Sequence, residues 1–282
     1  MTVERLFIVG AGQMGSGITQ VALQAGMRVD LFDVQDDFPD RTAKFFASSF
    51  QKSVEKGRID AAQKEAYLSK LTLTTVLEAA TSADLIIEAI YEDAAAKKKL
   101  FNQLDSICGP TTVFASNTSS ISITELASST KRADRFIGMH FFNPVPVMKL
   151  LEVTTGLATS AETLETAREI GEKLGKVSVV SKDIPGFIVN RILDPMLNEA
   201  VYMLDEGVAT VEDIDKAMVN GCNHPMGPLA LTDLIGLDVV LAVMEVLHRE
   251  YGDSKYRPAP LLRKMVRAGY LGKKSGRGFY QY

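Results

Sequence analysis

The sequence has few of the residues that build disulfide frameworks and metal sites. Among its 282 residues are two cysteines, Cys108 and Cys222, and three histidines, His140, His224 and His248. The cysteines lie far apart in the chain, and their spacing from the histidines matches no zinc-binding pattern. We therefore expect neither a disulfide framework nor a metal site.

Long apolar runs and an excess of positive charge are also missing. An apolar run such as residues 239–244 is far shorter than the roughly 20 residues that cross a bilayer. The 31 Lys and Arg against 35 Asp and Glu give a net charge of -4, so no broad basic surface faces a nucleic-acid backbone. The residues before the first apolar run leave no room for a signal peptide. We expect a cytoplasmic protein with neither a membrane nor nucleic acid as a partner.

The composition and the apolar pattern predict two folded domains. Apolar residues make up 46% and charged residues 23% of the chain, the balance of an ordinary globular protein. The length favours two domains. Short apolar runs alternate with segments of helical periodicity up to Lys182, and this alternation predicts a mostly parallel sheet with helices on both faces. We expect a Rossmann-type α/β domain over residues 1–184 and an all-α domain over residues 185–282.

The expected elements follow from the periodicity of the apolar residues. The predicted strands are residues 6–9, 27–32, 71–74, 85–89, 112–115, 135–139, 150–154 and 177–180. The predicted helices of the first domain are residues 18–25, two helices within residues 41–70 that break near Gly57, and residues 94–107, 121–128 and 161–174. In the second domain nearly every segment is helical, and Pro195 conflicts with one of these helices.

A glycine motif follows the first predicted strand. The candidate cofactor-binding residues of this motif are Gly10, Gly12, Gln13, Met14 and Gly15. In the pattern G-x-G-x-x-G the first glycine permits a tight turn, the second admits a pyrophosphate and the third lets the helix pack on the strand. A structural turn made of glycines is the alternative interpretation, but the order of strand, glycines and helix favours a dinucleotide site.

An acidic residue at the end of the second predicted strand supports the same interpretation. Asp33 can accept hydrogen bonds from the adenosine ribose hydroxyls and would repel a 2'-phosphate. No arginine immediately follows Asp33, so NAD is favoured over NADP as the cofactor. Residues 36–40 contain a cluster of acids and Pro39 where a helix would usually begin. The sequence therefore does not define the shape of the adenosine pocket.

His140 is the candidate proton carrier. It follows the predicted strand 135–139 and opens a segment in which Pro144 and Pro146 favour an extended loop. Ligands gather at the carboxyl ends of strands in open α/β sheets, and histidine titrates near neutral pH, as proton abstraction from an alcohol requires. From the residues alone, a structural histidine stays an alternative.

Five motifs carry a resemblance to a known family. They are residues 116–120 (SNTSS), 140–144 (HFFNP) with 148–152 (MKLLE), 185–191 (PGFIVNR), 224–228 (HPMGP) and 272–280 (GKKSGRGFY). In this order the sequence resembles the 3-hydroxyacyl-CoA dehydrogenase family, most of all its free-standing bacterial members that act on 3-hydroxybutyryl-CoA. The resemblance implies NAD-dependent interconversion of an (S)-3-hydroxyacyl-CoA and a 3-oxoacyl-CoA, and a homodimer formed through the C-terminal helices.

The resemblance also assigns roles to single residues. It makes His140 the general base that takes the proton of the 3-hydroxyl as hydride leaves C3. Glu152 matches the acid that pairs with this histidine, and such an acid holds the tautomer and stabilises the imidazolium. Ser119 and Asn190 match positions that hydrogen-bond the reacting oxygen. Taken singly, Glu152 could instead be an exposed acid, Ser119 a helix N-cap and Asn190 a polar residue early in a helix.

Further residues match positions that bind the cofactor or the substrate. Glu92 and Lys97 match residues near the nicotinamide ribose, and Asn117 matches one near the nicotinamide end. The alternative for Glu92 and Lys97 is an exposed helix start with compatible charges. Lys52 and Lys56 could meet the phosphates of CoA, although a solvated helix face explains these lysines equally well.

Two other functions stay open from the sequence. The same scaffold could act on 3-hydroxyadipyl-CoA or on a free hydroxy or sugar acid. It could also be a non-catalytic nucleotide-binding protein. Intact His140, Glu152, Ser119 and Asn190 favour the enzyme.

Overall fold

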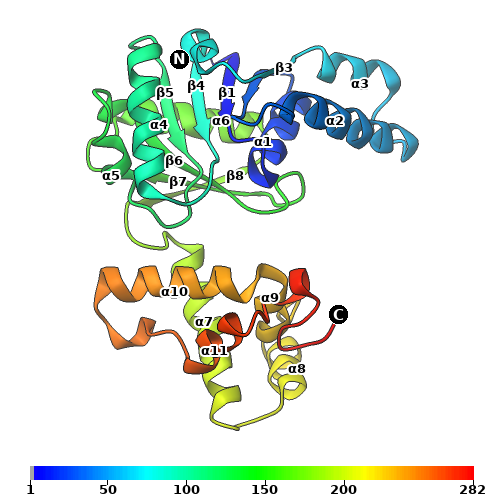
Figure 1. The fold of residues 1–282 in the computed structure, drawn as a ribbon, viewed down its shortest axis with the longest axis vertical. Helices are drawn as coiled ribbons and strands as arrows, with labels where there is room; N and C mark the ends of the chain where they lie inside the picture. Colours follow the sequence, from blue (N-terminus) through cyan, green and yellow to red (C-terminus); the bar gives the residue numbers. More distant parts are fainter. Residues whose placement is uncertain (1–2) are drawn as a thin grey trace. The chain divides into compact units, whose positions relative to one another are not determined.

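The structure is a computed structural model that describes residues 3–282 (Figure 1). The chain forms two compact units, of which the first ends at Ile184 and the second begins at Pro185. The first unit is an eight-stranded sheet with helices on both faces, and the second is built of helices with isolated bridges near its end. The predicted fold class is therefore confirmed.

The sheet has the strand order β3-β2-β1-β4-β5-β6-β7-β8. Its strands are β1 (Arg5–Val9), β2 (Arg28–Phe32), β3 (Leu71–Thr74), β4 (Leu85–Glu88), β5 (Val113–Ser116), β6 (Phe136–Phe141), β7 (Leu150–Thr155) and β8 (Val177–Lys182). Each predicted strand is present within two residues at either end. The first six strands are mutually parallel, whereas β7 runs antiparallel to β6. The connection of residues 142–149 is too short for the crossover of a dozen or more residues that a parallel partner needs.

The helices of the first unit begin earlier than predicted at two places. They are α1 (Gln13–Gln24), α2 (Phe38–Glu55), α3 (Ala61–Leu68), α4 (Ala94–Ile107), α5 (Ile123–Ala127) and α6 (Ala161–Lys173), with short 3₁₀ turns at Leu77–Ser82 and Ala133–Arg135. α1 begins inside the glycine motif, where the residues lack apolar periodicity. α2 begins at Phe38 because Pro39 is tolerated in a first helical turn, where its missing N–H has no partner to lose. The predicted break near Gly57 is confirmed.

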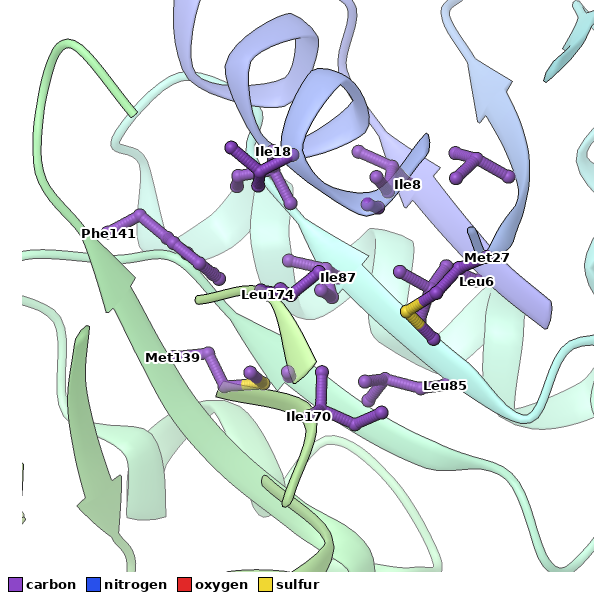
Figure 2. Packing of buried hydrophobic residues seen from close by; sticks show 14 of the residues in the cluster. Leu6, Ile8, Ile18, Met27, Leu85, Ile87, Met139, Phe141, Ile170 and Leu174 are labelled. Atoms are coloured by element: carbon purple, nitrogen blue, oxygen red, sulfur yellow. The ribbon is translucent and has the colours of Figure 1, made fainter. Parts of the chain in front are cut away.

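Two different sets of apolar side chains cover the two faces of the sheet. Strand side chains alternate between faces, so Leu6 and Ile8 lie on one face and Phe7 on the other. Ile18 of α1 and Ile170 of α6 belong to the buried cluster on the first face (Figure 2). On the opposite face the aromatic rings of α4, β5 and β6 pack together, through Phe101, Phe114 and Phe136. Burial on both faces explains why these strands read as continuous apolar runs.

The second unit is held by its own apolar core. Its helices are α7 (Val189–Asp205), α8 (Val211–Cys222), α9 (Pro228–Ile235), α10 (Leu237–Tyr251) and α11 (Pro260–Arg267), with 3₁₀ turns at Ser254–Tyr256 and Lys273–Ser275. Leu197, Leu229 and Met244 are among the fully buried residues of this core. α7 continues through Pro195, so the conflict seen in the sequence does not end the helix.

Some features are absent from the described part of the chain. None of the helices within residues 3–282 is long and apolar enough to cross a membrane. Over the same range, no three side chains of His, Cys, Asp or Glu are grouped as metal ligands. Both cysteines are free thiols, Cys108 buried and Cys222 exposed.

Candidate active site

The glycine motif forms a tight loop between β1 and α1. Gly10 has a φ of 103°, a conformation that favours glycine, and a Cβ there would lie 2.6 Å from the carbonyl oxygen of Ala89. A Cβ on Gly15 would lie 1.8 Å from the carbonyl oxygen of Gly10. A Cβ on Gly12 would meet no protein atom within 4 Å. The first and third glycines are thus needed by the fold, whereas the second leaves open space at the helix N-terminus.

The N-terminus of α1 is built to receive an anion. Gly12 is its N-cap and supplies no side-chain hydrogen bond, and the first turn, which Gln13 and Met14 open, contains no acid. The first N–H groups of a helix lack partners within the helix, and the helix dipole makes this end positive. A phosphate group satisfies both the N–H groups and the charge. The loop and helix therefore fit the pyrophosphate of NAD.

Asp33 lies beside this loop, directly after β2. Its Oδ2 accepts a hydrogen bond from the backbone N–H of Ala11 at 2.8 Å, and its Oδ1 accepts one from the N–H of Gln35 at 3.2 Å. The carboxylate is therefore held at the edge of the glycine loop. In this place an acid can accept a hydrogen bond from a ribose hydroxyl, as the sequence predicts.

A cavity of about 580 Å³ opens between α1, α2 and the loop that follows β6. Its lining includes Gln13 and Gln20 of α1, Arg41 and Phe45 of α2, and Asn143, Pro144 and Val145 of the loop. Arg41 is the cation of this lining and donates a hydrogen bond to Gln35 Oε1 at 3.1 Å. Lys52 and Lys56 are exposed on α2 and its C-cap and do not line the cavity.

His140 and Glu152 form a buried pair on adjacent strands. The antiparallel register of β6 and β7 places the two residues directly opposite each other. His140 Nδ1 lies 2.7 Å from Glu152 Oε2, and Glu152 is fully buried. A buried carboxylate requires such a partner, and a carboxylate at Nδ1 fixes the ring so that its proton chemistry takes place at Nε2. The pair can therefore act as a general base.

The segment after β5 reaches the same edge of the sheet. Asn117 Oδ1 accepts a hydrogen bond from the backbone N–H of Phe141 at 2.9 Å, which connects this segment to the residue next to His140. Ser119 is half-buried, and its backbone N–H donates to Glu92 Oε1 at 3.0 Å. The structure thus brings Asn117, Ser119 and Glu92 together, with Asn117 attached to the strand that carries the histidine.

Lys97 lies in the protein interior. Its side chain is 1% exposed, and its Nζ lies 2.6 Å from Glu88 Oε1 and 3.1 Å from Glu92 Oε2. The hypothesis of an exposed helix start at these positions is therefore wrong for Lys97. Burial raises the pKa of Glu88 despite the attraction of Lys97. The pKa of Glu92 is lowered, because Lys97 and the hydrogen bonds from Thr118 and Ser119 together outweigh its burial.

Sequence reasoning missed Glu88, although a signal for it was present. Glu88 ends the apolar strand β4 and is fully buried. A carboxylate at the carboxyl end of a parallel strand points to the edge where ligands bind in α/β sheets.

The last of the predicted site residues, Asn190, belongs to the helical unit and lies half-buried in the first turn of α7.

Comparison with protein families gives a match over nearly the whole chain. Residues 5–184 match the model of the 3-hydroxyacyl-CoA dehydrogenase NAD-binding domain. Residues 186–282 match the model of the C-terminal domain of 3-hydroxyacyl-CoA dehydrogenase.

Individual relatives are similar along their full length. A probable 3-hydroxybutyryl-CoA dehydrogenase of Bacillus subtilis is 53% identical, with 100% of this chain and 98% of the relative covered. A 3-hydroxybutyryl-CoA dehydrogenase of Clostridioides difficile is 52% identical, with 99% of each covered. The crystal structure of (S)-3-hydroxybutyryl-CoA dehydrogenase from Ralstonia eutropha is 49% identical and has a TM-score of 0.97 over 100% of this chain and 99% of that one.

Proposed function

Because the chain belongs to the 3-hydroxyacyl-CoA dehydrogenase family of NAD-dependent oxidoreductases, we propose that it interconverts (S)-3-hydroxybutyryl-CoA and acetoacetyl-CoA. The observation that carries the proposal is the His140–Glu152 pair at the carboxyl end of β6. This is the same edge of the sheet as the glycine loop after β1. The names of the full-length relatives support the four-carbon substrate.

The proposed chemistry requires one proton and one hydride to leave the substrate. NAD, when bound, would supply the acceptor for the hydride of C3. His140 takes the proton of the 3-hydroxyl at Nε2, and Glu152 stabilises the imidazolium that results. Ser119 and Asn190 are proposed as donors to the reacting oxygen, where negative charge develops. In the reverse direction His140 returns the proton to the same oxygen.

The residues proposed to hold NAD lie along the edge of the sheet. Gly12 leaves the space for the pyrophosphate, and the first N–H groups of α1, including those of Gln13 and Met14, bind it. Asp33 accepts hydrogen bonds from the hydroxyls of the adenosine ribose. Glu92, whose side chain is 37% exposed, is proposed to reach the nicotinamide ribose, with Lys97 buried behind it and Asn117 near the nicotinamide end.

The CoA portion of the substrate is proposed to follow one face of α2. Arg41, Phe45, Lys52 and Lys56 recur at helical spacing and lie on one stripe of this helix and its C-cap. At about 1.5 Å per residue the stripe is roughly 22 Å long, which suits an extended anionic ligand. The first two residues line the cavity, and the two lysines continue the positive charge beyond it.

A homodimer through the helical unit is part of the proposal. Ile192, Leu234 and Val239 of this unit are large apolar side chains with exposed fractions of 69%, 52% and 44%. Exposed apolar side chains on helices are typical of surfaces that a second subunit covers. The cytoplasmic location stays a prediction.

The test is the oxidation of NADH by acetoacetyl-CoA, measured by absorbance for the wild type and for His140→Ala. NADPH, a longer 3-oxoacyl-CoA and free acetoacetate are compared under the same conditions. We expect NADH oxidation with the CoA esters that is lost in the variant, and little oxidation with free acetoacetate. No activity on any CoA ester, with NADH binding intact, would contradict the proposal and favour a free hydroxy acid or a non-catalytic role.

A further inference from the structure

We propose that Glu88 and Lys97 are a buried positioning pair that sets, through Glu92, the place of the Ser119 backbone. This inference rests on the proposed function, because it gives Glu88 and Lys97 a purpose in the same site. Neither residue needs to touch the substrate for this role. Glu88, Lys97 and Glu92 form one continuous chain of polar contacts with residues 118–120, the loop that follows β5. This chain can be followed from the sheet outward.

The first link joins three segments around Glu88. Its Oε1 lies 2.6 Å from Lys97 Nζ and accepts a hydrogen bond from the backbone N–H of Ile90 at 2.8 Å. Its Oε2 accepts a hydrogen bond from Ser116 Oγ at 2.6 Å. Glu88 thus connects the end of β4 to α4 and to the end of β5. A buried carboxylate with partners on both oxygens is held in a single orientation.

The second link is the ammonium group of Lys97, which lies between two carboxylates. It is 2.6 Å from Glu88 and 3.1 Å from Glu92, and its own side chain is 1% exposed. A buried ammonium without a partner is costly, so these two acids fix its position. Because Glu88 is anchored from both sides, its carboxylate determines where the ammonium group lies.

The third link passes from Glu92 to the loop. Its Oε2 faces Lys97, and its Oε1 accepts hydrogen bonds from Thr118 Oγ1 at 2.5 Å, Ser119 N at 3.0 Å and Ser120 N at 3.3 Å. One oxygen therefore binds the interior cation and the other holds the loop. A rotation of this carboxylate would move the backbone of Ser119, and small displacements of a positioning group lower turnover strongly.

Two charged residues next to Lys97 on the same helix, Asp93 and Lys98, have other partners. On its own helix, Asp93 caps the N-terminus by accepting from Ala96 N, and Lys98 pairs with Glu125 of α5 at 2.6 Å. From the segments next to it, Lys97 is faced by the carboxylates of Glu88 and Glu92. The Lys98–Glu125 pair is more than a third exposed on both sides, so it is a matched ion pair without the proposed role.

The experiment compares Glu88→Gln with Lys98→Gln in the full-length protein. In Glu88→Gln the shape is kept while the charge that holds Lys97 is lost. We expect kcat for acetoacetyl-CoA reduction to fall by about tenfold or more, while the KM for acetoacetyl-CoA changes less than about threefold, because the residues of α2 that are proposed to bind the CoA portion are untouched. Lys98→Gln should keep the wild-type kcat. A kcat within about twofold of wild type in folded Glu88→Gln would overturn the proposal.

A double variant separates positioning from a loss of stability. Glu88→Gln with Lys97→Met removes both buried charges, which relieves the unpaired ammonium. We expect this protein to fold and to keep the low kcat, since nothing then holds Glu92 Oε2. A return of kcat to the wild-type value in the double variant would overturn the proposal, even if Glu88→Gln alone fails to fold.

A measurement without substrate keeps this inference separate from the proposed function. Amide hydrogen exchange, followed by mass spectrometry, reports on the N–H groups of Ser119 and Ser120. Their exchange should be at least about tenfold faster in Glu88→Gln and in the double variant, and unchanged in Lys98→Gln. Unchanged exchange in all variants would contradict the positioning role. An inactive wild type with faster loop exchange in Glu88→Gln would contradict the proposed function alone.

Discussion

Glu152 lies directly opposite His140 because the chain reverses direction between β6 and β7, and the two side chains meet at 2.7 Å. The short connection of residues 142–149 produces this reversal. An antiparallel pair places one residue of each strand face to face, so both members of the pair are held by the sheet itself. The strand reversal after β6 therefore also brings together the two residues that we propose as the general base.

Removing the charge of Glu152 should lower turnover without preventing folding. Glu152→Gln keeps the size of the side chain but no longer stabilises a protonated His140 and can select the wrong tautomer. We expect kcat to fall by about 10²- to 10⁴-fold, with NADH affinity little changed. Steady-state rates and fluorescence titration with NADH measure the two quantities.

The control for this variant is Glu162→Gln, an exposed acid in the first turn of α6. It should have the wild-type kcat. If Glu152→Gln were to keep a kcat within about twofold of wild type, the general-base assignment would be wrong for this pair.

Much of the first unit could be predicted from the sequence because its signals are local. Strands buried on both faces appear as short apolar runs, and each of them was found within two residues. The glycine motif can be recognised because its glycines lie at fixed positions in one short segment, where the first and third meet local steric demands and the second leaves open space. The predicted start of α1 is too late because residues 13–17 have no apolar periodicity, and that of α2 is too late because the acids and the proline of residues 36–40 interrupt the apolar pattern.

The interior charges could not be predicted in the same way. Residues 97–99 are three consecutive lysines, which look alike in the sequence, yet Lys97 is buried whereas Lys99 is exposed. The difference arises from Glu88, which lies on another element and meets Lys97 only in the fold. Contacts between distant elements leave no periodic signal, so such a pair is recognised only when the structure is present.

The glycine loop gives a prediction that separates binding from folding. At Gly12 the backbone φ is -67° and a Cβ meets no protein atom, so Gly12→Ala should change the free energy of unfolding by less than about 1 kcal/mol. The added methyl group occupies the space proposed for the pyrophosphate. We expect the Kd for NADH to rise by about tenfold or more.

The contrasting variant is Gly15→Ala, whose Cβ would lie 1.8 Å from the carbonyl oxygen of Gly10. Here we expect a loss of thermal stability as well as of NADH binding. Thermal unfolding and NADH titration of both variants check the two expectations. Unaltered NADH binding by Gly12→Ala would show that the pyrophosphate lies elsewhere.

The helical unit contains an acid that should make its stability depend on pH. Asp194 of α7 is 4% exposed, no cation pairs with it in the described part of the chain, and burial raises its pKa from 3.8 to about 7. The folded state therefore favours the protonated carboxyl group of Asp194. The contribution of this group to the free energy of unfolding is complete below pH 3.8 and is lost as the pH rises towards 7. Asp194→Asn should thus be more stabilising at pH 8 than at pH 5, by about 2 to 3 kcal/mol. Urea unfolding of both proteins at the two pH values measures this difference, in which the other titrating groups cancel. An equal effect of the substitution at pH 5 and pH 8 would show that Asp194 is already ionised in the folded protein.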